Sequence, residues 1–186
     1  METTDAAMAL QTLVTNARET SFNEDYTMIG ENIEILRENF AASTAADKVW
    51  QIWGAATALG LPHNNQTHLA AAVECLHNAS LVQDDLQDED TQRRGQVSVW
   101  SRFGCNVAIN LTDLMIATSF VLLAQMDNQS CLPGLLTCMQ RAIAVTLQGQ
   151  SRDLCDEGTT RAIKTSLAVA KSKSGPLFAL CLELPL

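Results

Sequence analysis

The stretch "LHNASLVQDDLQDEDTQRRGQ", residues 76–96, joins an apolar segment to five acidic residues and then to two arginines and a glycine. Its first part continues a segment from about residue 66 with apolar or small side chains at spacings of three and four, which is typical of a helix. Carboxylates at the C-terminal end of a helix meet the negative end of its dipole. So many acids are unfavourably placed there unless they bind something positive.

The same spacing recurs through most of the 186-residue chain, whereas alternating strand patterns are absent. Nine glycines and four prolines are few for this length, and the breaks fall at 60–62, at 94–95 and at 128–133. We therefore predict one all-α domain over residues 1–186. The predicted helices span residues 5–19, 28–40, 45–60, 66–90, 106–127, 133–157 and 159–184.

The composition excludes several classes of protein. A formal net charge of -9 argues against a nucleic-acid surface, which needs clustered Lys and Arg. Six cysteines without a C-x-x-C pair argue against zinc and favour a reducing compartment. The N-terminus has no basic signal-peptide region, and the longest apolar run, 114–124, is too short to span a bilayer. We expect a soluble cytoplasmic protein with no transmembrane segment.

The acids of the opening stretch have the spacing of a cation site. Asp84 and Asp88 are four residues apart and share one helical face, while Asp85 is expected to point elsewhere on the rim. Several carboxylate oxygens aimed in one direction suit a hard cation such as Mg²⁺. The alternative is a solvated helix end, which the dipole argument disfavours.

Arg93 and Arg94 add a second chemistry. Guanidinium groups bind phosphate oxygens bidentately and stay charged at any relevant pH, and Gly95 would let the backbone turn closely behind them. Acids for a metal beside arginines for phosphate suggest a metal-bridged diphosphate. The alternative is a pair of local salt bridges to Glu89 and Asp90.

A second acidic place lies in "LQGQSRDLCDEGTTR", residues 147–161. Gln150 and Asp153 are three residues apart on a predicted helix, from which Asp153 could face the first cluster. Facing helices that donate carboxylates inward are a known way to build a metal site in a bundle. The alternative is a polar helix face on which Arg152 and Arg161 are the partners.

A third element is "AKSKSGPLF", residues 170–178, in which two lysines precede an apolar run. A lysine inside a bundle needs a counter-charge, and a diphosphate would supply one. We expect this role for Lys173, with Ser174 beside it. Lys171 fits better as a surface lysine whose stem lies along the protein.

Taken together, these segments resemble the trans-isoprenyl diphosphate synthases, also called polyprenyl synthetases. Residues 84–95 match the family's first aspartate-rich motif, D-D-x-x-D-x-x-x-x-R-R-G, at the same spacing, and "LHNASLVQDD" is similar to the family's run into it. "GQSRDL" matches G-Q-x-x-D-L, and "KSGPLFALCLELP" is similar to the K-T-G-x-L-F helix. The similarity covers roughly residues 45 to 186. It implies an antiparallel helical bundle of the isoprenoid synthase type around a deep apolar pocket, and a homodimer.

The resemblance also implies an activity and the residues that carry it. The activity is Mg²⁺-dependent prenyl transfer, in which an allylic diphosphate ionises and condenses with isopentenyl diphosphate. The catalytic aspartates would be Asp84, Asp85 and Asp88, and the metal ligands would be Asp84, Asp88 and Asp153. The allylic diphosphate would be held by Arg93, Gln150, Lys173 and Ser174, and isopentenyl diphosphate by His77, Arg94 and Lys48.

Product length in the family depends on the bulk just before the first aspartates. Ala79 and Ser80 occupy these positions here, and both are small. The resemblance therefore implies a pocket that stays open near this point and a product of C20 or longer.

The chain departs from the family in two places. Where the family has G-G-K-R-x-R-P, only Lys48 remains positive, which weakens the expected isopentenyl diphosphate site. The family's second D-D-x-x-D would fall beyond Leu186, so we expect that the C-terminal part of the fold is lacking and that this chain alone has weak or no turnover. Two alternatives stay open: a terpene cyclase on the same scaffold, and a non-catalytic partner subunit of a prenyl synthase.

Overall fold

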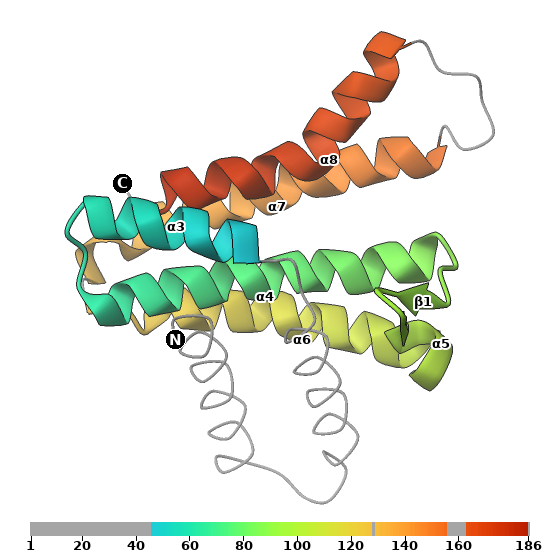
Figure 1. Ribbon diagram of the computed structural model, residues 1–186, viewed down its shortest axis with the longest axis horizontal. Coiled ribbons are helices and arrows are strands. Elements are labelled where there is room, and N and C mark those ends of the chain that lie inside the picture. The colour runs from blue at the N-terminus through green and yellow to red at the C-terminus, as the bar shows by residue number, and fades with distance from the viewer. Residues whose placement is uncertain (1–45, 128, 156–162, 186) are drawn as a thin grey trace, which may run out of the picture.

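Long helices lying side by side make up the described part of the chain, which in this computed structural model comprises residues 46–127, 129–155 and 163–185 (Figure 1). The predicted helices 5–19 and 28–40 lie outside these residues. The other five predicted helices are confirmed to within about one turn at each end. The helices are α3 (Ala46–Ala58), α4 (His63–Gln87), α5 (Val99–Phe103), α6 (Cys105–Ala124), α7 (Leu132–Cys155) and α8 (Ile163–Glu183), with a short 3₁₀ helix at Gln129–Cys131.

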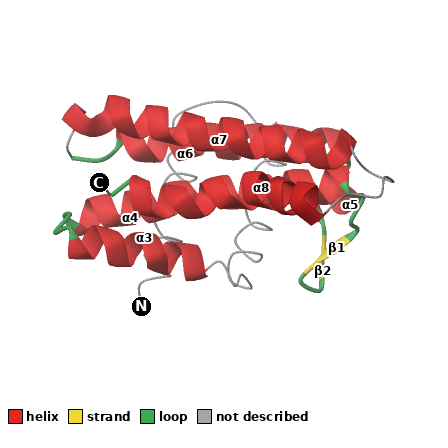
Figure 2. Cartoon of the chain, turned by 90° about the horizontal axis from the view of Figure 1, so that it is seen from above, coloured by secondary structure: helices red, strands yellow, loops and turns green. Residues whose placement is uncertain are grey.

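Helix α4 is the centre of the bundle, because it packs against α3, α5, α6 and α8. Its neighbours approach closely over Ala70, Ala71 and Ala72, which are each at most 1% exposed. Helices α7 and α8 pack against each other over most of α8, whose first turns bend away from α7 (Figures 1 and 2). The end of α4 that carries the acids is thereby placed near α7 and α8.

A small hairpin follows α4 and folds the two arginines back toward it. Strands β1 (Gln92–Arg93) and β2 (Gln96–Val97) pair antiparallel, with Arg93 opposite Gln96. Both turn residues have positive φ, 53° at Arg94 and 79° at Gly95, as a tight two-residue hairpin turn requires. The sequence analysis did not predict these strands, since two residues are too few to show an alternating pattern.

All six cysteines are free in the structure. Cys75 lies in the core, and its thiol hydrogen-bonds the Met115 carbonyl at 3.2 Å. Burial, with a further contribution from the charge of Glu74, raises the pKa of Cys75 to about 12. This thiol is therefore a buried structural group and not a nucleophile.

Two adjacent residues of α6 provide a test of the core. Leu122 is fully buried, whereas the neighbouring Val121 is 49% exposed. Leu122→Ala should lower the free energy of unfolding by about 2–5 kcal/mol, because the cavity adds to the lost burial. Val121→Ala should lower it less, because the fold of a single chain leaves about half of the Val121 side chain exposed. Urea denaturation followed by circular dichroism measures both, and equal losses would contradict this description of the core.

Candidate functional site

Acids from two helices converge on one lysine from a third. The Lys173 Nζ on α8 lies 2.8 Å from Asp84 Oδ1 on α4 and 3.3 Å from Asp153 Oδ2 on α7. Asp153 therefore faces Asp84 across a shared ammonium. Burial by itself opposes the lysine's charge, but its hydrogen bonds to the two carboxylates and their charges outweigh burial and raise the pKa of Lys173.

Gln150 ties α7 to the same end of α4. Its Nε2 donates to Gln87 Oε1 at 2.8 Å and to Asp84 Oδ1 at 3.3 Å. Only 8% of Gln150 is exposed, so these bonds are made in a largely dry environment. The carboxylate of Asp84 is thus oriented by an amide as well as by a lysine.

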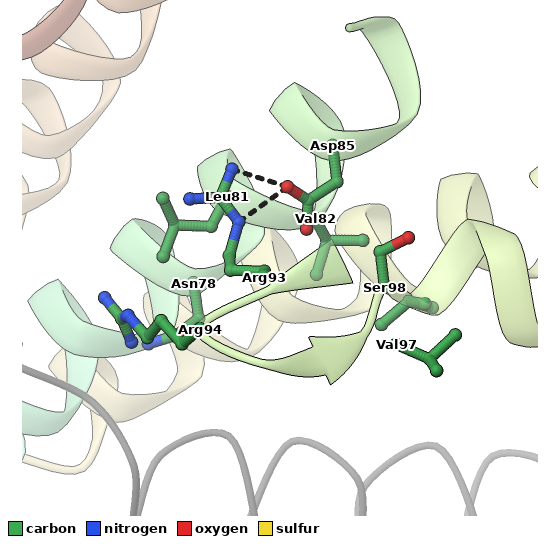
Figure 3. Close-up of a pocket in the computed structure, with 9 residues that line it drawn as sticks. Asn78, Leu81, Val82, Asp85, Arg93, Arg94, Val97 and Ser98 are labelled. Carbon is green, nitrogen blue, oxygen red and sulfur yellow. Dashed lines mark hydrogen bonds and ion pairs between the residues drawn. The ribbon is translucent and has the colours of Figure 1, made fainter. Parts of the chain in front are cut away.

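Arg93 holds the other side of the aspartate pair. Its Nε donates to Asp85 Oδ1 at 2.6 Å (Figure 3). Its Nη2 also lies 3.5 Å from Asp84 Oδ2. These pairs replace the local salt bridges to Glu89 and Asp90 that the sequence left open. Asp85 is 4% exposed, so the expectation that it lies on the rim is wrong. Burial raises the pKa of Asp85, and the bond from Arg93 opposes that rise.

Asp88 caps the end of α4 and belongs to the same electrostatic cluster. It is exposed, and its N–H donates to the Asp84 carbonyl at 2.8 Å. Desolvation, followed by the negative charge of Asp84, raises the pKa of Asp88, while Lys173 opposes the shift and Asp153 adds to it. Partial burial and the neighbouring negative charges thus both disfavour the charged form of Asp88.

The described residues contain no ready-made group of three His, Cys, Asp or Glu side chains around one point. They do contain carboxylates from α4 and α7 that already meet at a positive charge. Carboxylate oxygens from facing helices are donors that Mg²⁺ accepts, and Mg²⁺ completes its shell with water and phosphate oxygens. Asp84 and Asp153 therefore fit Mg²⁺, provided that Lys173 moves aside. Asp88 lies near enough for the charges of Asp84 and Asp153 to raise its pKa.

A cleft between α4, α7 and α8 opens beside this cluster. Its polar end includes Asp84, Gln150, Lys173 and Ser174, and its walls include Leu81, Leu147, Leu177 and Phe178. The buried hydroxyl of Thr146 also lines it and has no hydrogen-bond partner in the described part of the chain. A charged end with an apolar wall suits a ligand that has an anionic head and a hydrocarbon tail. Gln87, Thr146 and the apolar wall were not among the residues that the sequence singled out.

The predicted isopentenyl diphosphate residues are not gathered in one place. His77 lines the cleft with Lys173 and Ser174. Arg94 lines a separate pocket between α4 and the hairpin, together with Arg93 and Asp85 (Figure 3). The two pockets adjoin, since Leu81 lines both. Lys48 lies in α3, and its side chain falls outside the described part of the structure.

The two small residues before the aspartates have different surroundings. Ser80 lines the cleft, and its hydroxyl donates to the His77 carbonyl at 2.6 Å. Ala79 is 1% exposed and packs in the hydrophobic core. Of the pair, Ser80 is the one that the structure brings to the wall of this cleft.

Known proteins resemble this chain in sequence and in fold. The chain is 32% identical to the geranylgeranyl diphosphate synthase of Mycobacterium tuberculosis over 134 aligned residues. These residues are 72% of this chain and 38% of that protein. It matches the crystal structure of a decaprenyl diphosphate synthase from Rhodobacter capsulatus with a TM-score of 0.79 and 26% identity, over 99% of this chain and 53% of that one. An isoprenoid synthase family member from Thermotoga neapolitana shares the fold, with a TM-score of 0.81 at 22% identity over 100% of this chain and 68% of that one.

The described helices therefore form the bundle of the isoprenoid synthases. The chain spans about two fifths of the length of the first curated relative, since the match covers 38% of that protein. The family model described as polyprenyl synthetase matches residues 49–186, a range that contains both acidic segments and the lysine that joins them. The chain belongs to the polyprenyl synthetase family.

Proposed function

We propose that the protein is an Mg²⁺-dependent prenyltransferase that ionises an allylic isoprenoid diphosphate and condenses its hydrocarbon with isopentenyl diphosphate. The observation that carries this proposal is the convergence of Asp84, Asp153 and Lys173 at the polar end of an apolar-walled cleft. The related geranylgeranyl and decaprenyl diphosphate synthases support it, because both are named for prenyl diphosphate products.

The chemistry would divide between the two ends of the cleft. Bound Mg²⁺, held by Asp84 and Asp153 with Asp88 nearby, would neutralise negative charge on the leaving diphosphate. Lys173 would turn from the carboxylates to the diphosphate oxygens, with Ser174 and Gln150 beside it. The allylic C–O bond breaks as the diphosphate leaves. The double bond of isopentenyl diphosphate then forms the new C–C bond, and loss of a proton completes the product.

The apolar wall has its own part in the reaction. The hydrocarbon would lie against Leu147, Leu177 and Phe178. Leu147 and Phe178 are 41% and 45% exposed, so the bound hydrocarbon would cover them and thereby keep water from the allylic cation until the double bond attacks. His77 reaches the same cleft and Arg94 the adjoining pocket, which supports a second diphosphate beside the first. This second pocket favours elongation over the terpene cyclase alternative.

One assay separates the three functions. The protein is incubated with Mg²⁺ and allylic diphosphates, with and without isopentenyl diphosphate, and the products and ligand binding are both measured. Longer diphosphates that need isopentenyl diphosphate support elongation, whereas hydrocarbons or alcohols formed without it support cyclisation. Mg²⁺-dependent binding without turnover supports the partner subunit only if turnover is also absent when a second chain supplies the family's second aspartate-rich motif. Absence of Mg²⁺-dependent binding would refute the proposed site.

We further propose that the product is C20 or longer, because Ser80 leaves the cleft wall open. Ser80→Phe should shorten the product and weaken binding of a C20 diphosphate analogue more than that of a C5 analogue, since the ring fills space that only the longer tail needs. Ser101→Phe, on the exposed surface of α5, is the matched control. If Ser80→Phe binds each of the two analogues as tightly as the unchanged protein does, this assignment is wrong.

Ala79→Phe is expected to act less cleanly. It should also shorten the product if the ring reaches the tail. Because Ala79 is 1% exposed in the core, the larger side chain must displace packed neighbours, at about 1–3 kcal/mol of stability. A thermal melt of the variant, compared with that of Ser80→Phe, separates the two effects.

We also propose that the protein is a homodimer in the cytoplasm. One exposed face of α6 carries Leu114, Ala117 and Val121, and it would be covered in a dimer. By length and composition, α6 and the segment Gln129–Cys155 could also cross a membrane, a criterion that core helices of soluble proteins meet as well. Light scattering of the purified protein and fractionation of cells test the two proposals. A monomer, or a protein found only in the membrane fraction, would contradict them.

A further inference from the structure

Helices α7 and α8 touch backbone to backbone at one point. A Cβ atom added to Gly149 on α7 would lie 2.5 Å from the Lys173 nitrogen, 2.6 Å from the Ser172 carbonyl carbon and 2.9 Å from the Lys173 Cα. Separations below about 3 Å are far inside van der Waals contact between heavy atoms, which is near 3.5–4.0 Å for carbon. Only glycine permits this crossing as it stands.

The crossing coincides with the lysine that joins the acidic cluster. The backbone of Lys173 lies directly over Gly149, and its Nζ reaches Asp153 on α7 and Asp84 on α4. Gly149 and Asp153 are four residues apart and therefore share one face of α7. The absence of a side chain at 149 thus fixes how far the stem of Lys173 stands from both carboxylates.

We propose that Gly149 is a positioning residue, which sets the place of Lys173 and through it the affinity of the cleft for a diphosphate. This inference rests on the proposed role of Lys173 in binding diphosphate. A methyl group at 149 meets main-chain atoms, which cannot swing aside as the end of a flexible side chain can. Helix α8 must move away from α7, and the ammonium of Lys173 moves with it.

The chain offers a matched control for this substitution. Gly134 lies in the first turn of the same helix, is exposed, and has no atom within 4 Å of an added Cβ. Alanine in a helix is favoured over glycine by about 0.5–1 kcal/mol. Gly134→Ala should therefore stabilise the protein slightly and leave ligand binding unchanged.

The test measures binding of inorganic diphosphate in excess Mg²⁺ by calorimetry. Gly149→Ala should bind about tenfold more weakly than the unchanged protein, equivalent to roughly 1.4 kcal/mol, while Gly134→Ala binds as before. Circular dichroism should show the same helical content in all the proteins. Unchanged affinity of Gly149→Ala would overturn the proposal. So would loss of its helical signal, since Gly149 would then be a requirement for folding.

A double variant shows whether Gly149 acts through Lys173. If it does, Lys173→Gln and the combined Gly149→Ala, Lys173→Gln protein should bind diphosphate within about twofold of each other, because Lys173 carries the charged contact and Ser174, displaced with it, contributes only a neutral hydroxyl. A loss beyond this in the combined variant would overturn the proposal. If Lys173→Gln alone binds as well as the unchanged protein, the proposed role of Lys173 fails, and that failure is distinct from failure of the role of Gly149.

Discussion

Asp84→Asn should reduce the Mg²⁺-dependent affinity for an allylic diphosphate by about 100-fold or more, or roughly 2.7 kcal/mol. Asp84 is contacted by Lys173, by Gln150 and by Arg93, so three groups from three places in the chain converge on one carboxylate. Asparagine keeps the shape and one oxygen acceptor but loses the charge. A metal held jointly with Asp153 would lose a charged ligand, which asparagine replaces only weakly.

The measurement is calorimetric titration with a non-hydrolysable thiodiphosphate analogue at saturating Mg²⁺. Glu183→Gln is the control. Glu183 is also an ion-paired carboxylate, but it is the last residue of α8, and its Oε2 lies 2.7 Å from Nη2 of Arg141 on α7. The affinity of Glu183→Gln should stay within about twofold of that of the unchanged protein. If Asp84→Asn and Glu183→Gln bind the analogue equally well, Asp84 is not part of the site.

Lys173→Gln should change two affinities in opposite directions. In the unchanged protein the ammonium neutralises Asp84 and Asp153, so a metal ion must compete with it for the same oxygens. Removing the ammonium should strengthen the binding of Mn²⁺ alone, used as a spectroscopic substitute for Mg²⁺. It should weaken the binding of a Mg²⁺–diphosphate complex about tenfold or more, because a charge-assisted contact worth roughly 1.5–3 kcal/mol is lost.

Electron paramagnetic resonance of free Mn²⁺ measures the first affinity, and calorimetry the second. Lys171→Gln is the matched control, because Lys171 is exposed on the same helix two residues earlier. Lys171→Gln should leave the affinities for Mn²⁺ and for the Mg²⁺–diphosphate complex unchanged. If Lys173→Gln weakens the binding of both Mn²⁺ and the Mg²⁺–diphosphate complex, the lysine stabilises the fold near the site. The proposal that its ammonium moves from the carboxylates to the diphosphate is then wrong.

The long helices could be read from the sequence because their apolar and small residues recur at spacings of three and four. The sequence did not show that α4 is the central helix, in which every residue from Leu69 to Leu76 is buried. The hairpin could not be read from the sequence, since its strands have two residues each and its turn depends on the backbone angles of Arg94 and Gly95. For the same reason the pairing of Arg93 with the buried Asp85 was not foreseen. Which carboxylate an arginine reaches depends on how the chain folds back, and spacing along the sequence does not contain that information.

Within the site, the sequence suggested that Asp153 could face the first cluster, and the structure brings it to Asp84 through Lys173. The sequence also contained a signal that two helices approach closely at Gly149. A glycine inside a helical pattern costs about 1 kcal/mol relative to alanine, so its presence points to a close approach of backbones. Which helix approaches it there, and at which residue, emerges only from the packing of α7 on α8.

The most direct test of the account is the dependence of ligand binding on Mg²⁺. A farnesyl thiodiphosphate analogue is titrated into the protein by calorimetry, first with excess Mg²⁺ and then with a chelator in its place. We predict saturable binding that needs Mg²⁺ and that is lost in Asp84→Asn. Equal binding with Mg²⁺ and with chelator, or binding that Asp84→Asn retains, would contradict the claim that these carboxylates form the metal side of a diphosphate site.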